Sequence, residues 1–184
     1  MNFEILKKYI FFSKQGLVYL ILFLLLFLLS CFMVLNNGSQ KKEILPELRL
    51  ITDSIRNHYQ KKPTYAGLNT LTVLEEKIVP AYMIRNNKIF SRLKNEILVG
   101  RDEIGSTSIA SDTDFSLIYL NMNQNKCVNA VTEAFGISLG LKSIQILNQN
   151  RYEFSYGTDL NLPIKKQDAL KYCQAKNTIV FTFE

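Results

Sequence analysis

The stretch KKEILPELRLITDSIRNHYQ, residues 41–60, decides how the rest of the chain can fold. Its apolar side chains recur at spacings of three and four residues: Ile44, Leu48, Ile51, Ile55 and Tyr59. This spacing places them on one face of a helix and leaves polar residues on the other face. Pro46 should bend that helix or restart it. We therefore predict a helix whose apolar stripe lies on the core of a folded domain.

A long apolar segment precedes this helix. Residues 17–35 carry no charge, and as a helix that rises about 1.5 Å per residue they would span close to the roughly 30 Å hydrocarbon core of a bilayer. Three lysines precede the segment, whereas two lysines and a glutamate follow it closely. The slight excess of positive charge on the amino side favours an amino end in the cytoplasm. We expect one membrane crossing, with the bulk of the chain outside.

The apolar segment has four alternative fates: a removed signal, a lipoprotein signal, a permanent anchor, or an assembly helix that is cut near its start and kept. A removed signal is disfavoured, because the apolar run exceeds the usual 7 to 15 residues and no small-x-small site follows it. The sequence LLSC, residues 28–31, resembles a lipobox and would make Cys31 a lipidated residue. However, the apolar FMVL continues beyond it, so Cys31 also fits a buried small apolar residue.

The chain beyond residue 60 alternates strand and helix patterns. Runs rich in β-branched and aromatic residues predict strands at 95–100, 114–122, 141–147 and 177–183. Helical spacing and turn signals predict short helices at 70–77, 126–135 and 166–173. A long helix followed by this order indicates an α+β fold with a mainly antiparallel sheet. The length of this part suits one compact domain.

Charge and composition limit the partners and the chemistry. The formal net charge is +6, but the lysines after residue 35 occur as isolated pairs among acidic residues, which is typical of a solvated surface and disfavours nucleic-acid binding. His58 is the only histidine and lies on the polar part of the helix, so a catalytic triad lacks a base. The P-loop-like GRDEIGST, residues 100–107, has Ser106 where lysine must contact phosphate.

No catalytic group emerges from the remaining acidic residues. Asp112 and Asp114 could form a carboxylate pair, but no acidic partner motif accompanies them, so they more simply start a strand or face solvent. The chain is therefore not expected to be an enzyme, and no cofactor is expected.

Cys127 and Cys173 are the only cysteines outside the apolar segment. They should pair if the domain faces an oxidising compartment. Closing a loop of about 47 residues would stabilise the fold by roughly 4 kcal/mol in the chain-entropy model. Two free thiols or a pair of metal ligands are the alternatives. A zinc site needs about four nitrogen or sulfur ligands, which a chain with one histidine does not supply, so no metal is expected.

Several features follow one another along almost the whole chain. A short basic leader ends in KQG, and the apolar helix starts directly after Gly16. Further along come four features: the Tyr65-x-Gly67-Leu68 turn, Val79-Pro80 with Met83 soon after, the two late cysteines, and the closing strand NTIVFTF. This order of features resembles that of the type IVb pilins, specifically the PilS-like group.

This resemblance implies how the chain is processed and assembled. Type IVb pilins are inner-membrane precursors whose leader a prepilin peptidase removes, here after Gly16, so that Leu17 becomes the N-methylated first residue. The apolar helix then leaves the membrane and packs with other pilin subunits in the filament core, driven by the pilus assembly machinery. The implied disulfide joins Cys127 to Cys173 and cross-links the variable region at the filament surface.

The implied organisation has four parts: a basic leader at 1–16, a transmembrane and assembly helix at 17–35, an amphipathic continuation at 36–62 and a pilin-like globular head at 63–184. Before assembly the head would lie in the periplasm on a single membrane pass, and after assembly it would belong to an extracellular pilus.

One position departs from the pilin pattern. Pilins carry a glutamate five residues after the cleavage site, and this chain has Ile21 there. Pilin-like proteins that lack the acid tend to be minor or tip components. The leading hypothesis is a pilin or minor pilin-like subunit that acts by assembly and adhesion. The alternative is a permanently anchored or lipidated component of an envelope secretion or conjugation machine.

Overall fold

The structure is a computed structural model that describes residues 18, 22–27, 44–100, 113–133, 139–157 and 159–184. The chain divides into two compact units, Met1–Lys41 and Lys42–Glu184. In the first unit, residues 22–27 are helical and their apolar side chains are exposed. None of the described helices has the length and apolar character needed to cross a membrane. Most of the expected membrane segment, 17–35, lies outside the described residues.

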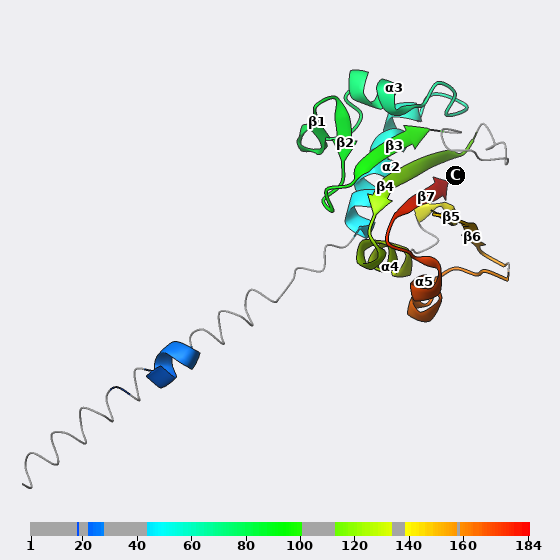
Figure 1. Ribbon diagram of the computed structural model, residues 1–184. Helices are drawn as coiled ribbons and strands as arrows, with labels where there is room; N and C mark the ends of the chain where they lie inside the picture. Colours follow the sequence, from blue (N-terminus) through cyan, green and yellow to red (C-terminus); the bar gives the residue numbers. More distant parts are fainter. Residues whose placement is uncertain (1–17, 19–21, 28–43, 101–112, 134–138, 158) are drawn as a thin grey trace, which may run out of the picture. The chain divides into compact units, whose positions relative to one another are not determined.

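The second unit is an α+β head built on a seven-stranded sheet (Figure 1). Its strand order is β1-β2-β3-β4-β7-β5-β6, and all neighbouring strands are antiparallel. The strands are β1 (Ile84–Arg85), β2 (Lys88–Phe90), β3 (Glu96–Gly100), β4 (Phe115–Met122), β5 (Leu141–Leu147), β6 (Arg151–Ser155) and β7 (Asn177–Phe183). The described helices of the head are α2 (Leu45–Tyr59), α3 (Thr70–Glu75), the 3-10 helix η1 (Ala81–Met83), α4 (Gln124–Thr132) and α5 (Lys166–Tyr172).

Helix α2 has the apolar stripe that the sequence predicts. Its five stripe positions are all buried: Ile44, Leu48, Ile51, Ile55 and Tyr59. Pro46 lies in the first turn, where its missing N–H has no partner within the helix to lose. In the head, Pro46 therefore begins a helix, and the stripe after it belongs to the main core.

The centre of the sheet supplies the other half of this core. Strands β4 and β7 pair with Phe115 opposite Phe183, Leu117 opposite Phe181, and Tyr119 opposite Ile179. All six side chains are fully buried. Because alternate residues of a strand share one face, this register gathers the large side chains into one continuous layer. The strands predicted at 95–100, 114–122, 141–147 and 177–183 agree with β3, β4, β5 and β7 to within one residue.

The structure adds three strands that the sequence did not predict. Strands β1 and β2 form a hairpin through Asn86 and Asn87, which both have positive φ and so close a two-residue turn that suits the twist of a hairpin. Strand β6 pairs with β5 at the other edge of the sheet. β1 and β2 are only two and three residues long, so they show no apolar periodicity. β6, RYEFS, does alternate polar and apolar residues, and this short strand signal was missed.

Two predicted helices have different ends. The helix predicted at 70–77 stops at Glu75, and Lys77 adopts φ 53°, which is incompatible with a continuing helix. The helix predicted at 126–135 begins earlier, at Gln124, because the Asn123 side chain accepts a hydrogen bond from the Lys126 N–H at 3.0 Å and caps the helix. It ends at Thr132.

The amino end of α2 is capped from a distant part of the chain. Ile44 at the cap position makes no capping hydrogen bond with its own side chain. Instead, the carboxylate of Glu133 accepts hydrogen bonds from the N–H groups of Ile44 and Leu45, both at 2.6 Å. A negative charge at this end also interacts favourably with the helix dipole. A residue at the end of α4 therefore caps the start of α2.

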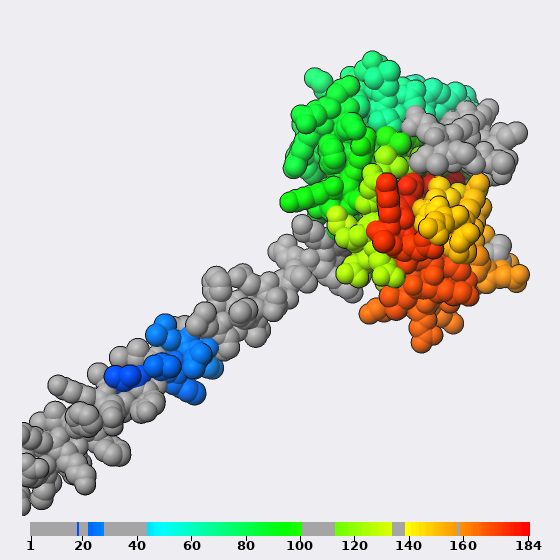
Figure 2. Space-filling view, in the orientation of Figure 1, coloured from blue at the N-terminus to red at the C-terminus, as the bar shows by residue number. Residues whose placement is uncertain are grey.

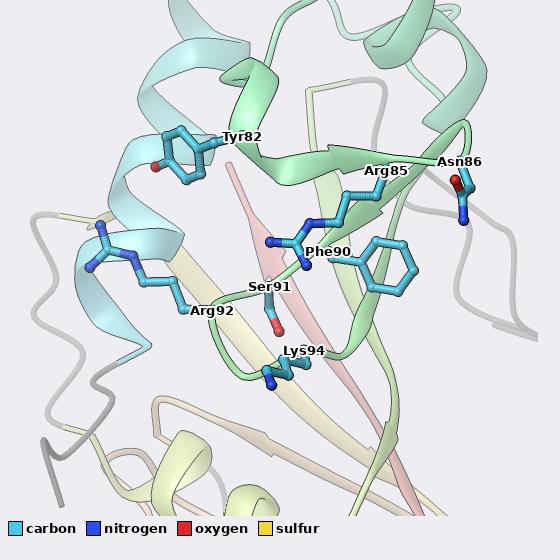
Figure 3. Close-up of a pocket in the computed structure, with 7 residues that line it drawn as sticks. All are labelled: Tyr82, Arg85, Asn86, Phe90, Ser91, Arg92 and Lys94. Carbon is cyan, nitrogen blue, oxygen red and sulfur yellow. The ribbon is translucent and has the colours of Figure 1, made fainter.

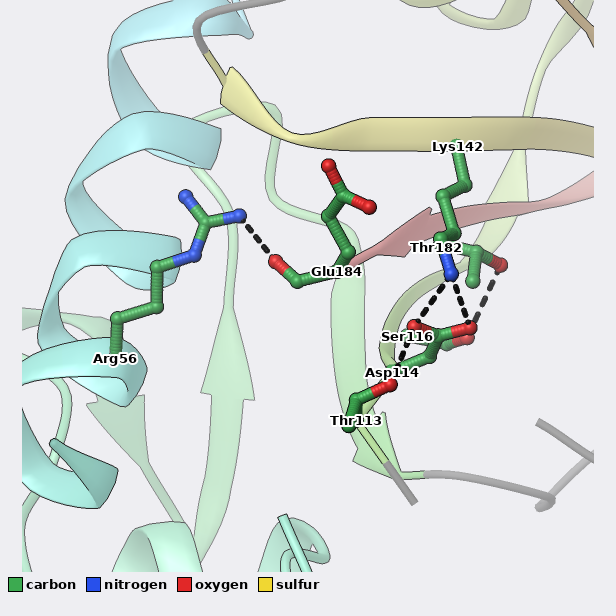
Figure 4. Close-up of polar contacts among 7 residues, drawn as sticks. All are labelled: Arg56, Thr113, Asp114, Ser116, Lys142, Thr182 and Glu184. Carbon is green, nitrogen blue, oxygen red and sulfur yellow. Dashed lines mark hydrogen bonds and ion pairs between the residues drawn. The ribbon is translucent and has the colours of Figure 1, made fainter. Parts of the chain in front are cut away.

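The last turns of α2 are tied to the end of the final strand (Figure 4). The Arg56 guanidinium donates to the main-chain oxygens of Leu139 at 3.0 Å and Glu184 at 2.6 Å. Gly140 has φ +67°, and a Cβ at that position would collide with the Arg56 guanidinium. A glycine is therefore required here both by the backbone and by the close approach of the arginine.

We predict that Glu133→Gln lowers the free energy of unfolding by about 1–2 kcal/mol, because one acceptor oxygen and the charge at the helix end are lost. Urea unfolding of the full chain in mild detergent, followed by far-ultraviolet circular dichroism, measures the change. Glu75→Gln removes an exposed carboxylate elsewhere and is the matched control. Equal stability of the two variants would contradict the proposed cap.

Candidate functional site

The disulfide-bonded part of the head is built around two helices. Cys127 lies on α4 and Cys173 directly follows α5, and the structure joins them in a disulfide with their Cα atoms 5.9 Å apart. Both cysteines are buried. The bond spans 46 positions of the sequence and links the two helices beside the start of β7. This is the pairing that the resemblance to pilins implied.

A buried asparagine orders the chain next to the disulfide. The Asn177 amide donates to the main-chain oxygens of Met122 at 3.0 Å and Gln174 at 2.6 Å, and its oxygen accepts from the Gln174 N–H at 2.8 Å. Gln124 on α4 adds a hydrogen bond from its side chain to the Cys173 oxygen at 3.0 Å. Because buried main-chain groups must find partners, these contacts fix the route of the chain from α5 into β7.

A buried carboxylate connects α2, β4 and the turn before β3. Glu47 is 2% exposed, and its side chain accepts hydrogen bonds from the Tyr119 hydroxyl at 2.9 Å and the Arg92 N–H at 2.6 Å. Burial raises the pKa of Glu47 above its ordinary value, whereas the two hydrogen bonds and the charge of Arg92 act in the opposite direction. Burial and the nearby Glu47 carboxylate raise the pKa of Tyr119 well above its ordinary value.

The turn between β2 and β3, residues 91–95, is held from several sides. Within it, the Ser91 N–H donates to the Asn95 oxygen at 2.8 Å and the Asn95 N–H donates to the Ser91 hydroxyl at 3.0 Å. From α4, the Lys126 ammonium donates to the Leu93 oxygen at 2.7 Å and to the Asn95 side chain at 3.0 Å. Together with the Glu47 carboxylate, these contacts give the turn a defined conformation.

A pocket opens beside this turn at the β1 edge of the sheet (Figure 3). Its volume is about 370 Å³, and no acidic residue is among the described residues that line it. The lining residues are Tyr82, Arg85, Asn86, Phe90, Ser91, Arg92 and Lys94. In Figure 2 the η1–β2 region (green) and the region of α5 (orange) occupy separate parts of the visible face of the head. We call the concavity lined by these seven residues the edge pocket.

The structure gives the candidate catalytic residues other roles. His58 pairs with Glu76, and Asp114 accepts hydrogen bonds from the Lys142 ammonium at 2.8 and 2.9 Å (Figure 4). Asp112, its expected partner, lies outside the described residues, as does Ser106. Within the part of the chain that the structure describes, no group of three or more His, Cys, Asp or Glu side chains could hold a metal ion.

The residues expected to matter for processing and assembly fall in the amino-terminal part of the chain. Gly16, Leu17 and Ile21 lie outside the described residues, and so does Cys31. The functional sites expected near the amino end therefore remain predictions from the sequence.

Comparison with known proteins identifies the family. The model of the PilS family, described as PilS N terminal, matches residues 39–184, which is most of the chain. The protein therefore belongs to the PilS family of type IVb pilins, which are structural proteins and not enzymes. Membership of this family implies a place in the cell envelope or in a pilus.

No curated protein sequence matches the chain. Among solved structures, the crystal structure of a type IVb pilin from Salmonella typhi is similar, with 19% sequence identity and a TM-score of 0.48. The match covers 73% of this chain and 94% of that chain.

Sequence reasoning missed Glu47, Glu133 and the edge pocket. The partners of Glu47 and Glu133 lie between 45 and 89 positions away along the chain, so no local pattern reveals them. The edge pocket did leave a signal in the sequence. The stretch IRNNKIFSRLK, residues 84–94, combines an Asn-Asn turn with four cations and no acid.

We predict that Cys173→Ser lowers the free energy of unfolding by about 4 kcal/mol, since the closed loop is lost from the unfolded chain. The start of β7 should then become the first site of proteolysis. Urea unfolding and limited proteolysis with mass mapping measure both effects. Cys31→Ser is the matched control and should leave the stability of the head unchanged. Recovery of Cys127 and Cys173 as free thiols from unreduced native protein would contradict the pairing.

Glu47 makes stability depend on pH in a defined direction. Its pKa is raised in the folded state, so its contribution to stability is complete below the ordinary pKa and is lost as the pH rises through the folded-state pKa. The Glu47→Gln variant should not lose stability in this way as the pH rises, because it has no titrating carboxyl group at this position. The stability of the native protein relative to the variant should fall by up to about 1.4 kcal/mol per pH unit in that window. Urea titrations between pH 4 and pH 8 measure it, with Glu75→Gln as control. A constant difference would contradict the assigned titration.

Proposed function

We propose that this protein is a structural subunit of a type IVb pilus, of the minor or tip kind, that acts by assembly and surface adhesion. The observation that carries the proposal is the PilS family match over residues 39–184. The buried stripe of α2 and the disulfide support it, because they make a compact head that can stand on a longer helix. This role requires no chemistry of the protein itself.

The proposed route runs from the membrane to the filament. The precursor sits in the bacterial inner membrane through residues 17–35, with its head in the periplasm. A prepilin peptidase cuts after Gly16, and Leu17 becomes the methylated amino terminus. The apolar segment then serves a second time, as the surface that packs against other pilin subunits when the assembly machinery extracts the chain.

Ile21 is the reason for proposing a minor or tip position. In a core of packed apolar helices, a glutamate at this position would neutralise the terminal ammonium of a neighbouring subunit. Isoleucine leaves that charge uncompensated, at a cost of several kcal/mol. A subunit without the acid is therefore poorly suited to follow copies of itself and better suited to a position with no preceding partner.

The LLSC sequence at 28–31 favours a second candidate, a lipidated or permanently anchored component of an envelope secretion or conjugation machine. The two candidates leave different amino termini in the native host. Cleavage after Gly16 indicates a pilin, an intact chain indicates an anchor, and a diacylglyceryl group on Cys31 indicates a lipoprotein. Intact mass and amino-terminal sequencing distinguish the three.

We predict that the protein alone forms no long filaments in a host with a pilus assembly system, and that it enters filaments when a pilin with the glutamate is also present. Ile21→Glu should enable assembly without that partner, because it restores the missing pair. Electron microscopy of sheared material with immunogold labelling measures the outcome. Ile21→Leu is the matched control and should behave like the native chain. Abundant filaments of the native protein alone would contradict a minor or tip role.

A further inference from the structure

The edge pocket concentrates positive charge that the fold does not use. Arg85 and Lys94 form no ion pair with any described residue, whereas Lys88 of the same hairpin pairs with Glu96 at 2.9 Å. Arg92 adds a third cation, which also acts on the buried Glu47. Cations that line one concavity without a neighbouring acid create a local positive potential, which favours the binding of an anion there.

The pocket also presents aromatic surface and neutral polar groups. Tyr82 is 58% exposed, which is high for a large aromatic side chain, and the half-buried Phe90 lines the same concavity. The buried Ser91 hydroxyl, which accepts a hydrogen bond from the Asn95 N–H, also lines the pocket. Figure 3 shows Arg85 extending from β1 toward the turn that carries Ser91, Arg92 and Lys94.

The main chain that carries the two cations of the turn is held in place before any ligand arrives. The main chain of Arg92 is bound by Glu47, and the residues on either side of Lys94 are bound by Lys126. The conformational entropy that a binding site normally loses on binding is therefore partly lost already during folding. This distinguishes the edge pocket from a chance group of surface lysines.

We infer that the edge pocket binds a terminal anionic sugar, that is, a sugar ring bearing a carboxylate or sulfate group. Arginine side chains recognise these planar or tetrahedral oxyanions through paired N–H donors. The Tyr82 and Phe90 rings offer an apolar surface for the C–H face of the sugar. A volume of about 370 Å³ is near the lower limit for ligand sites and accommodates one or two sugar rings.

A nucleic acid fits the edge pocket less well. Its phosphate backbone carries charges every few ångströms and needs a continuous track of cations. Outside the segment 84–94, the lysines of the head are scattered, either singly or as pairs such as Lys61–Lys62 and Lys165–Lys166. In Figure 3 the side chains of Arg85 and Lys94 extend into the region beside the turn, whereas the Arg92 guanidinium points toward α2, and this small number of cations matches a ligand that ends in one anionic group.

The inference rests on the proposed adhesion role for its biological meaning, but the binding itself can be measured on purified protein. The full chain in mild detergent is titrated by calorimetry with 3′-sialyllactose, lactose 3′-sulfate and neutral lactose. We expect at least one anionic sugar to bind and lactose to bind at least about tenfold more weakly, since lactose lacks the charge-assisted hydrogen bonds to the cations. Preference between the two anionic sugars identifies the carboxylate or the sulfate as the recognised group.

Substitutions locate the site. Arg85→Glu should weaken binding about tenfold or more, and Tyr82→Ala should weaken it severalfold. Lys61→Glu makes a comparable charge change on an exposed residue outside the pocket and should leave affinity within about twofold. Unchanged circular dichroism and an intact disulfide verify that each variant is folded.

Several results would overturn the inference: equal binding of lactose and the anionic sugars, no binding of either anionic sugar, or equal effects of Arg85→Glu and Lys61→Glu. Tighter binding of a single-stranded oligonucleotide or an acidic peptide would also overturn it. Electron microscopy of filaments separates this result from the pilus proposal. Protein that joins filaments but binds no anionic sugar refutes the sugar site alone, and protein that binds the sugar but joins no filament refutes the pilus role alone.

Discussion

The packing of the α2 stripe against the β4–β7 layer is the interaction on which the rest of the head depends. The helix supplies Leu48, Ile51 and Ile55, and the sheet supplies a continuous layer of large side chains. Burying such side chains contributes roughly 1.5–3 kcal/mol each, and because many of them share one core their sum exceeds the contribution of the polar contacts.

Polar groups refine this packing at the places where it brings distant segments together. Glu133 closes the start of α2, Arg56 ties its last turns to β7, and Glu47 joins its first turns to β4 and the turn before β3. Each contact satisfies a charged or main-chain group that burial would otherwise leave unpaired, and so makes one arrangement of the helix on the sheet preferable to its neighbours. The disulfide secures the opposite part of the head, where short helices supply less apolar contact.

The residues that stabilise the head and the residues that line the edge pocket belong to different parts of the structure. The disulfide, Asn177 and the α2 contacts are buried and hold the fold together. The edge pocket lies on a hairpin at the rim of the sheet, and hydrogen bonds with Glu47 and Lys126 hold its turn in one conformation. Its cations can therefore remain exposed and unpaired without loosening the core.

The sequence by itself determined the elements whose pattern is local. The spacing of Ile44, Leu48 and Ile51 predicted α2, because burial on one face of a helix imposes a period that can be read along the chain. Runs rich in β-branched and aromatic residues predicted β3, β4, β5 and β7, because such side chains favour the extended backbone. The order of motifs along the chain also indicated the pilin family. Only two cysteines lie outside the apolar segment, so their pairing needed little further information.

Only the tertiary structure decided what depends on contacts between distant residues. The short strands β1 and β2 form a hairpin that pairs with the edge of β3, and at two and three residues they are too short to carry a periodic signal. The roles of Glu47 and Glu133 depend on partners that folding brings from 45 to 89 positions away. The edge pocket arises in the same way, because η1, the hairpin and the turn meet there only after the sheet has formed.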